Sequence, residues 1–252
     1  MPVIYGIHAV SEAINARRVS RLLHERGAGP RVDALVARAN ELRIPTETLD
    51  RRALERLTRG GVHQGVAAHL ERVAAYTLEE LVQEGATPAL LVVLDGNEDP
   101  QNVGAILRSA DAAGASGVIR QARHAAPLDG ATAKASAGAV SHVRIATVVN
   151  ISRALEELKA LNVWTVGLEA EAPETYDAVD FTVPTAIVLG AEGTGLRRLV
   201  RETCDRLVSI PMAGAVSSLN VSVAAGVTLF EAARQRRIPA GRGASGRPGG
   251  AR

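Results

Sequence analysis

Three small polar residues, Ser217, Ser218 and Asn220, lie together in the segment "MAGAVSSLNVSVAAGVTLFEAARQ" (212–235). The residues that follow are compatible with a helix. Ser217 or Ser218 could cap it, because a side-chain oxygen at a helix start accepts a hydrogen bond from a free N–H group. One cap uses one oxygen, so the other polar side chains are candidates for binding a ligand or positioning a hydroxyl group.

A glycine-rich turn is the second candidate. Gly190, Gly193 and Gly195 lie in "IVLGAEGTGLRRL" (187–199), after a run of apolar residues. Glycine lets the backbone approach a ligand or adopt a positive φ. Spacing alone leaves two interpretations open, a ligand-binding loop and an ordinary strand-to-helix turn. The sequence has no GxxxxGK[ST] motif, and "LDGNEDPQNVGA" (94–105) lacks GxGxxG, which argues against a P-loop and a Rossmann dinucleotide site.

The elements that must position these residues alternate between strand and helix. Strand-like runs occupy 89–96, 117–119, 142–149, 163–168, 185–190 and 206–211, and helical patterns occupy 100–115, 151–161, 195–203 and 218–235. Such alternation predicts an α/β domain with a mainly parallel sheet covered on both faces.

The first 70 residues predict a separate small α/β module, with helices at 8–16, 32–42 and 51–57 and strands at 44–49 and 63–70. We expect a linker at 71–88, the larger domain at 89–237, and a disordered Arg/Gly tail at 238–252.

Composition restricts the functional classes. The chain has 252 residues and one cysteine, Cys204, which excludes a disulfide framework, and its six histidines have no ligand spacing, so no metal site is expected. No signal peptide or membrane span is evident, and a cytoplasmic protein is expected.

Charge is distributed unevenly along the chain. The net charge is +4 over 1–76, −8 over 77–231 and +6 from Arg234 onward. This favours polyanion binding by the ends. The 27 arginines against two lysines agree equally well with a GC-rich genome, so both explanations stay open.

Three segments together resemble a known family. In order and spacing, "DPQNVGAILRSADAAG" (99–114), "IVLGAEGTGL" (187–196) and "SIPMAGAVSSLNVSVAAGVTLFE" (209–231) resemble the motifs of the SpoU family of RNA ribose 2′-O-methyltransferases. The front module, with "IYGIHAV" (4–10) and "GVHQGVAA" (61–68), resembles the RNA-binding domain of the ribosomal-protein L30e type. The combination is similar to the RlmB branch, which methylates a guanosine ribose in 23S rRNA.

The resemblance implies a C-terminal SPOUT-type domain with a deep trefoil knot that binds S-adenosylmethionine. Its cofactor pocket would be formed by backbone and side chains of Gly190, Gly195, Ile210, Met212 and Leu219. A homodimer is also implied, with the partner subunit packing on the final helix. Packing of that helix within its own chain is the alternative.

The family's catalytic residues match Arg108, Asn102, Glu192, Ser218 and Asn220. A ribose 2′-hydroxyl must lose a proton as it attacks, and the pKa of arginine, above about 12, makes it a poor base. We favour Arg108 as an electrostatic clamp, with Ser218 and Asn220 positioning the hydroxyl, although the family also allows a deprotonated arginine. Alternatively, Arg108 could pair with Asp111 on a helix surface.

The sequence leaves two other functions open. A tRNA ribose methyltransferase would share the catalytic half. A non-catalytic RNA-binding protein would keep the L30e-type module beside a degenerate methyltransferase domain, although the intact set of Arg108, Ser218 and Asn220 argues against it.

Overall fold

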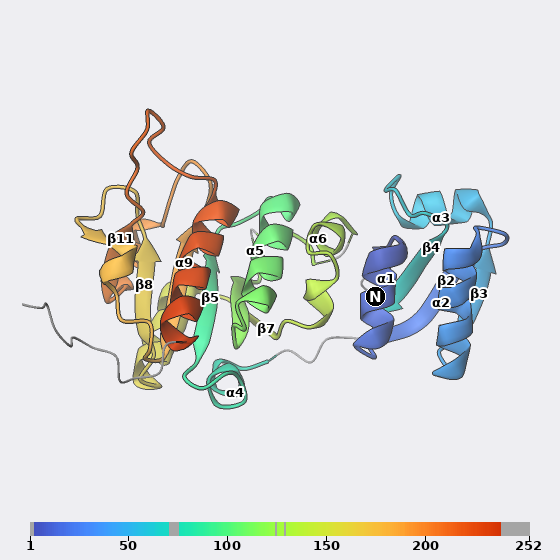
Figure 1. The fold of residues 1–252 in the computed structure, drawn as a ribbon, viewed down its shortest axis with the longest axis horizontal. Coiled ribbons are helices and arrows are strands. Elements are labelled where there is room, and N and C mark those ends of the chain that lie inside the picture. Colours follow the sequence, from blue (N-terminus) through green and yellow to red (C-terminus); the bar gives the residue numbers. More distant parts are fainter. Residues whose placement is uncertain (1–2, 71–75, 124, 129, 238–252) are drawn as a thin grey trace, which may run out of the picture.

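The computed structural model describes residues 3–70, 76–123, 125–128 and 130–237. Its strands form a four-stranded sheet near the N-terminus and a seven-stranded sheet in the rest of the chain (Figure 1). The four-stranded sheet has the order β1-β4-β2-β3, and the seven-stranded sheet has the order β7-β6-β5-β10-β8-β11-β9.

The front module is a mixed sheet packed with helices. Strand β4 is antiparallel to β1 and β2, whereas β3 is parallel to β2. Its elements are β1 (Val3–Tyr5), α1 (Ile7–Asn15), β2 (Val19–Glu25), α2 (Pro30–Glu41), β3 (Thr46–Leu49), α3 (Arg51–Leu57) and β4 (Val66–Leu70). The sequence did not predict β1 or β2. Strand β2 carries Arg21, His24 and Glu25 among its apolar residues, which obscures both the alternating and the continuous apolar pattern.

The large sheet is parallel throughout, in agreement with the prediction of a mainly parallel sheet. Its strands are β5 (Leu90–Asp95), β6 (Gly117–Gln121), β7 (Ile145–Val148), β8 (Trp164–Leu168), β9 (Glu174–Thr175), β10 (Thr185–Gly190) and β11 (Arg206–Ser209). Strand β10 lies between β5 and β8, and β11 lies beyond β8. This order is consistent with the knotted domain that the family resemblance implies.

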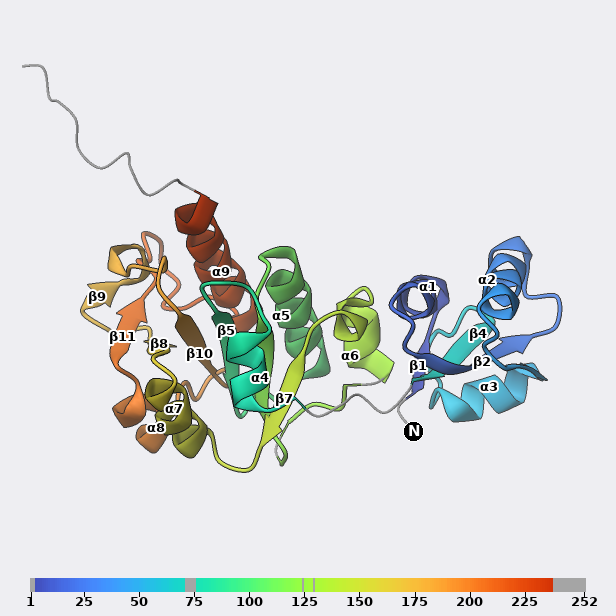
Figure 2. The ribbon, with the colours of Figure 1, turned by 90° about the horizontal axis from the view of Figure 1, so that it is seen from below.

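Helices cover both faces of the large sheet (Figure 2). Helices α5 (Pro100–Ala112), α6 (Gly130–Ala135) and α9 (Val221–Arg237) lie on one face, and α4 (Leu78–Gln83), α7 (Ile151–Ala160) and α8 (Arg198–Thr203) lie on the other. Successive residues of β5 alternate between these layers: Val92 joins the first core and Val93 the second. Helix α4 lies within the segment 71–88 that we expected to be a linker, and it packs in the second core through Leu78 and Leu81.

The end of α9 is anchored by Arg236. Its guanidinium donates hydrogen bonds to the backbone oxygens of Phe181, Pro88, Ala89 and Val183, next to the amino ends of β5 and β10. Burial lowers the pKa of Arg236 from its usual value. Two arginines of the basic C-terminal region therefore have structural partners, since Arg234 is bonded to Glu231. The tail at 238–252 lies outside the described residues.

The two modules meet where the front helix α1 faces the segment after α6. Arg18 donates a hydrogen bond of 2.8 Å to the backbone oxygen of Ser141 in the short helix η1 (Ala139–Ser141), and Glu12 pairs with His142 at 3.2 Å. Helix α6 packs closely on α5, because a Cβ atom at Gly104 would lie 2.4 Å from that of Ala135.

Within the described ranges, no helix is long and apolar enough to cross a membrane.

Candidate active site

A cavity of about 580 Å³ opens at the carboxyl ends of β8, β10 and β11. Parallel sheets bind ligands at this edge, where loops rather than helix packing line the surface. Its walls include the predicted cofactor residues Gly190, Gly195, Ile210, Met212 and Leu219. Ser217, Ser218, Asn220 and Glu192 line it as well. The glycine turn and the polar cluster, which are separated in the sequence, therefore border one cavity.

The turn from Gly190 to Arg197, called the glycine loop below, closes tightly on itself. The amides of Ala191 and Gly195 donate hydrogen bonds to each other's backbone oxygens, at 3.2 and 2.9 Å. Gly193 and Gly195 have φ angles of +80° and +67°, the left-handed region that favours glycine. A Cβ atom at Gly190 would lie 2.2 Å from the backbone carbon of Gly195. Gly190 is therefore required for the loop to close.

Asn102, Glu192 and Asn220 form a continuous polar contact beside the cavity. Asn102 lies in the first turn of α5. Asp99 caps this helix, because its side chain accepts a hydrogen bond from the backbone N–H of Asn102. Its side-chain amide donates to Glu192 at 2.8 Å, and its oxygen accepts from the Asn220 amide at 2.9 Å. These pairs join positions 90 and 118 residues apart. Three residues from the three motif segments are thus held together, with Asn102 at the centre.

Asn220, rather than a serine, caps the last helix. Helix α9 starts at Val221, and the Asn220 side chain accepts hydrogen bonds from the amide and hydroxyl of Ser222, at 2.9 and 2.6 Å. The predicted cap by Ser217 or Ser218 is wrong, because both residues lie before this turn. Both are exposed, and neither makes a hydrogen bond within the described part of the chain.

Arg108 lies apart from this cluster. It is exposed on α5, two turns beyond Asn102, and does not line the cavity of its own chain. The alternative pairing with Asp111 is wrong, since no ion pair joins the two side chains, and neither side chain has a hydrogen-bond or ion-pair partner among the described residues. The guanidinium of Arg108 is therefore available to another molecule.

Two acidic residues in the cavity wall were not among the predicted site residues. Glu169 and Glu171 follow the carboxyl end of β8 and line the cavity with Glu192. None of these three carboxylates forms an ion pair within the described ranges. Their position after the strand-like run 163–168 was the available signal, because ligand sites of parallel sheets collect there. The described residues contain no group of three or more His, Cys, Asp or Glu side chains arranged to hold a metal.

Comparison with known families and proteins agrees with this arrangement. The SpoU rRNA Methylase family matches residues 89–230, and the RNA 2′-O ribose methyltransferase substrate-binding family matches residues 3–75. A 23S rRNA (guanosine-2′-O-)-methyltransferase RlmB from Pseudomonas putida is 45% identical over 241 residues, 93% of this chain and 97% of that protein. RlmB from Pseudomonas syringae is 47% identical over 240 residues, 92% of this chain and 95% of that protein.

Solved structures show the same fold. The SpoU methyltransferase AviRb from Streptomyces viridochromogenes, in complex with the cofactor AdoMet, has a TM-score of 0.79 at 30% identity, covering 93% of this chain and 90% of that one. An RNA 2′-O ribose methyltransferase has a TM-score of 0.74 at 32% identity, covering 94% of this chain and 89% of that one. With both modules and all three motif segments matched, the chain belongs to the SpoU rRNA methylase family.

Proposed function

We propose that this protein transfers a methyl group from S-adenosylmethionine to the 2′-hydroxyl of a guanosine ribose in 23S rRNA. The convergence of the three motif segments on one cavity, with Asn102 joining Glu192 to Asn220, carries the proposal. The RlmB relatives, similar over more than nine-tenths of the chain, support rRNA as the substrate.

The cavity has the chemistry to hold this cofactor. Leu189, Val208 and Ile210 supply apolar wall for an adenine ring, and the open backbone at Gly193 admits a close approach. The carboxylates of Glu169, Glu171 and Glu192 suit the positive sulfonium and ammonium groups. When bound, the cofactor supplies an electrophilic methyl group. Gly190, Gly195, Ile210, Met212 and Leu219 are the residues that would hold it.

The polar residues around the ribose would have different roles. Both ends of the Asn220 amide are already bonded, so Asn220 serves to position the loop and its neighbours. The Ser218 hydroxyl is exposed and makes no hydrogen bond among the described residues. It can accept a hydrogen bond from the 2′-hydroxyl or donate one to it. Arg108 would stabilise the negative charge that develops on the attacking oxygen and bind an adjacent phosphate.

Substitution of Arg108 tests the chemical assignment. Arg108→Ala should lower kcat by at least ~100-fold, the scale of losing one preorganised electrostatic group, with little change in S-adenosylmethionine affinity. Arg153→Ala is the control, because Arg153 is also an exposed helix arginine and pairs only with Glu157. Wild-type turnover of Arg108→Ala with saturating RNA would remove Arg108 from the site.

We also propose that the protein acts as a homodimer, with α9 in the interface. Val223 and Phe230 are seven residues apart on α9 and are 50% and 48% exposed, so they form an apolar face pointing away from the chain's own core. Arg108 lies on the adjacent helix α5 without a partner. A second subunit across α9 would bring Arg108 to the other subunit's cavity.

Two measurements test the dimer. Phe230→Glu should convert the protein to monomers in light scattering, whereas Val149→Glu, at an 84% exposed site just after β7, should not. Mixing inactive Arg108→Ala and Ser218→Ala chains should restore activity, because a mixed dimer contains one intact site. No recovery after confirmed subunit exchange would place Arg108 and Ser218 in the same subunit's site.

The front module would bind the RNA. We place the domains at 1–70 and 89–237, with a tail at 238–252; in the joining segment 71–88, α4 packs on the larger domain. We expect the protein in the cytoplasm with the ribosomal RNA. On α3, Arg52 and Arg56 are exposed one turn apart, followed by exposed Arg59, and none of the three has an ion-pair partner in the described residues. Helix α3 and the loop before α9 both lie toward the upper side of Figure 1, so one RNA could contact both.

The arginines of α3 provide a test of RNA binding. Replacing Arg52, Arg56 and Arg59 with Gln should weaken rRNA binding and reduce the slope of log affinity against log salt by at most about two to three units. Replacing Arg21 and Arg38, which are paired with Glu47 and Glu41, should have less effect. An unchanged slope would exclude α3 from the contact. Preference for tRNA over rRNA in the same titration would instead favour a tRNA methyltransferase.

A further inference from the structure

The end of β5 and the segment after it, residues 95–102, hold the glycine loop at three points along its length. At the start, the side-chain amide of Asn97 donates to the backbone oxygen of Gly190 at 3.0 Å. In the middle, Asn102 donates to Glu192 at 2.8 Å. At the end, the Asp95 carboxylate accepts the backbone N–H of Arg197 at 2.9 Å. The loop is therefore fixed from one neighbouring strand end.

The contact at the loop's end is an ion pair with a fully buried acid. Asp95 is the last residue of β5, lies beside Gly190 in the sheet register and has no exposed surface. Its carboxylate also accepts a hydrogen bond of 2.7 Å from Nε of Arg197 and pairs with Nη2 of the same guanidinium. A buried carboxylate is unfavourable unless a charged partner compensates it. The buried carboxylate therefore holds Arg197 at this position, and Arg197 in turn fixes the end of the glycine loop.

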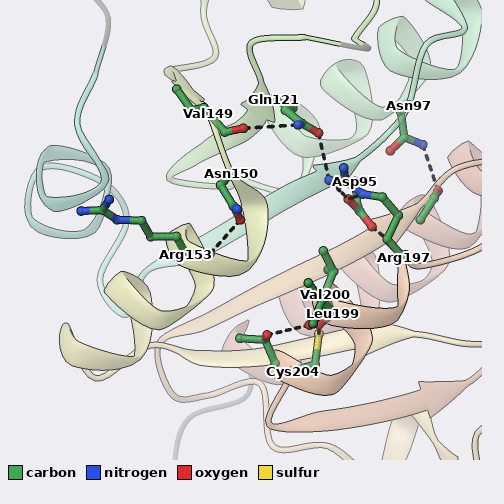
Figure 3. Close-up of polar contacts among 12 residues, drawn as sticks. Asp95, Asn97, Gln121, Val149, Asn150, Arg153, Arg197, Leu199, Val200 and Cys204 are labelled. Carbon is green, nitrogen blue, oxygen red and sulfur yellow. Dashed lines mark hydrogen bonds and ion pairs between the residues drawn. The ribbon is translucent and has the colours of Figure 1, made fainter.

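A second contact orients the Arg197 side chain. Its Nη2 donates to Oε1 of Gln121, and the Gln121 amide donates to the backbone oxygen of Val149 (Figure 3). The chain of contacts runs from the glycine loop across the ends of β5, β6 and β7. The guanidinium is thereby held by its Nε and Nη2 atoms, a geometry that lysine lacks.

The orientation of Asn97 is fixed by its partner. Asn97 is buried, and the Gly190 backbone oxygen can only accept a hydrogen bond, so the NH₂ group rather than the oxygen must face it. This bond and the Asp95–Arg197 pair hold the two ends of the glycine loop, while the Ala191–Gly195 bonds close it between them.

We propose that Asp95, Asn97 and Arg197 are positioning residues for the cofactor loop. They do not line the cavity, and they act by keeping the glycine loop closed before the cofactor arrives. Because a loop that is already ordered loses less conformational freedom on binding, this arrangement raises cofactor affinity. The proposal rests on the proposed function, since it assigns the loop to S-adenosylmethionine. It requires that loosening the loop raises KM for the cofactor and leaves kcat at saturation nearly unchanged.

The principal test compares Arg197→Gln with Arg198→Gln. Arg198 is the next residue and forms only an exposed pair with Glu202, so its replacement controls for loss of one positive charge at the start of α8. Calorimetry with S-adenosylmethionine should show affinity lowered about tenfold or more for Arg197→Gln, the effect of losing hydrogen bonds to a charged group. Arg198→Gln should match wild type. Arg197→Lys should recover only part of the loss.

Several outcomes would overturn the proposal. A folded Arg197→Gln protein with wild-type affinity would do so, and so would a loss confined to kcat with unchanged KM for the cofactor. If Arg197→Gln does not fold, Gln121→Ala replaces it, because this change keeps the pair with Asp95 and removes the contact at Nη2. It should weaken cofactor binding about two- to threefold, the effect of one lost hydrogen bond, and no change would contradict the proposal. Failure of the wild-type protein to bind S-adenosylmethionine would refute the proposed function instead.

Discussion

Two of the loops that line the cavity differ in how they are held. The glycine loop is bonded across itself at Ala191 and Gly195, and it is hydrogen-bonded to the end of β5 and to the segment that follows it. The loop from Ile210 to Leu219 makes no hydrogen bond within the described structure, and Val216 in it is 63% exposed. From this contrast we expect the glycine loop to be preformed and the loop from Ile210 to Leu219 to become more ordered when cofactor or a partner binds.

The largest expected effect comes from breaking the ordered loop. Gly190→Val should reduce S-adenosylmethionine affinity by at least ~100-fold, because the new side chain would overlap the backbone of Gly195 and Leu196 and the loop could not close. Gly114→Ala is the control, since no atom lies within 4 Å of its Cβ position, its φ is also positive, and it does not line the cavity. Calorimetry beside a thermal melt separates cofactor loss from unfolding. A folded Gly190→Val protein that binds normally would contradict the preformed loop.

Removing the link between the loops should have the next largest effect. Asn102→Ala loses the contacts to both Glu192 and Asn220, and we expect kcat/KM to fall about 10- to 100-fold, in line with two lost hydrogen bonds, one of them to a carboxylate. Gln101→Ala alters the neighbouring exposed side chain and should leave activity near wild type. Equal activity of the two variants would mean that Asn102 is not part of the site.

Hydrogen exchange tests the loops directly. On addition of saturating S-adenosylmethionine, amides between Ile210 and Leu219 should exchange at least about tenfold more slowly. The amides of Ala191 and Gly195, which are already bonded, should change less. Equal changes in both loops would remove the difference on which the comparison depends.

The smallest effect concerns Cys204, which lies between the two loops in the chain. Burial raises the pKa of its thiol to about 12, and its sulfur donates to the backbone oxygen of Val200 (Figure 3). The raised pKa means that any contribution of this thiol to stability is complete below about pH 9 and is lost as the pH rises toward 12. Iodoacetamide should therefore modify the folded protein very slowly at pH 8, and Cys204→Ala should keep its cofactor affinity. Rapid modification without unfolding would show that the thiol is accessible.

The sequence predicted the architecture best where burial is uniform. The apolar runs that became β5 and β10 predicted buried parallel strands, since both faces of such strands are covered. Strand β2 was missed because its polar residues interrupt the pattern. The N-cap was misplaced for a different reason: serine and asparagine are equally good caps, and only the path of the backbone selects Asn220.

The site could be predicted only in part. No spacing rule brings Asn102, Glu192 and Asn220 together, and their grouping came from resemblance to a family. Asp95 and Arg197 were missed, although one signal was present: an acidic residue ends the otherwise apolar run "ALLVVLD". Charged residues are rarely buried without a partner, so such an acid predicts an arginine or lysine nearby. The identity of this partner as Arg197 could not be predicted, because it depends on the path by which the glycine loop passes the end of β5.

Methyl transfer to RNA is the most direct test of the proposed function. The full-length protein would be incubated with S-adenosylmethionine carrying an isotope-labelled methyl group and with 23S rRNA from a strain lacking this gene, and the RNA then digested to nucleosides for mass spectrometry. We expect labelled 2′-O-methylguanosine from 23S rRNA, formed at least ~100-fold more slowly by the Arg108→Ala protein. Label on a base, label only in tRNA, or no label despite bound cofactor would contradict the assignment.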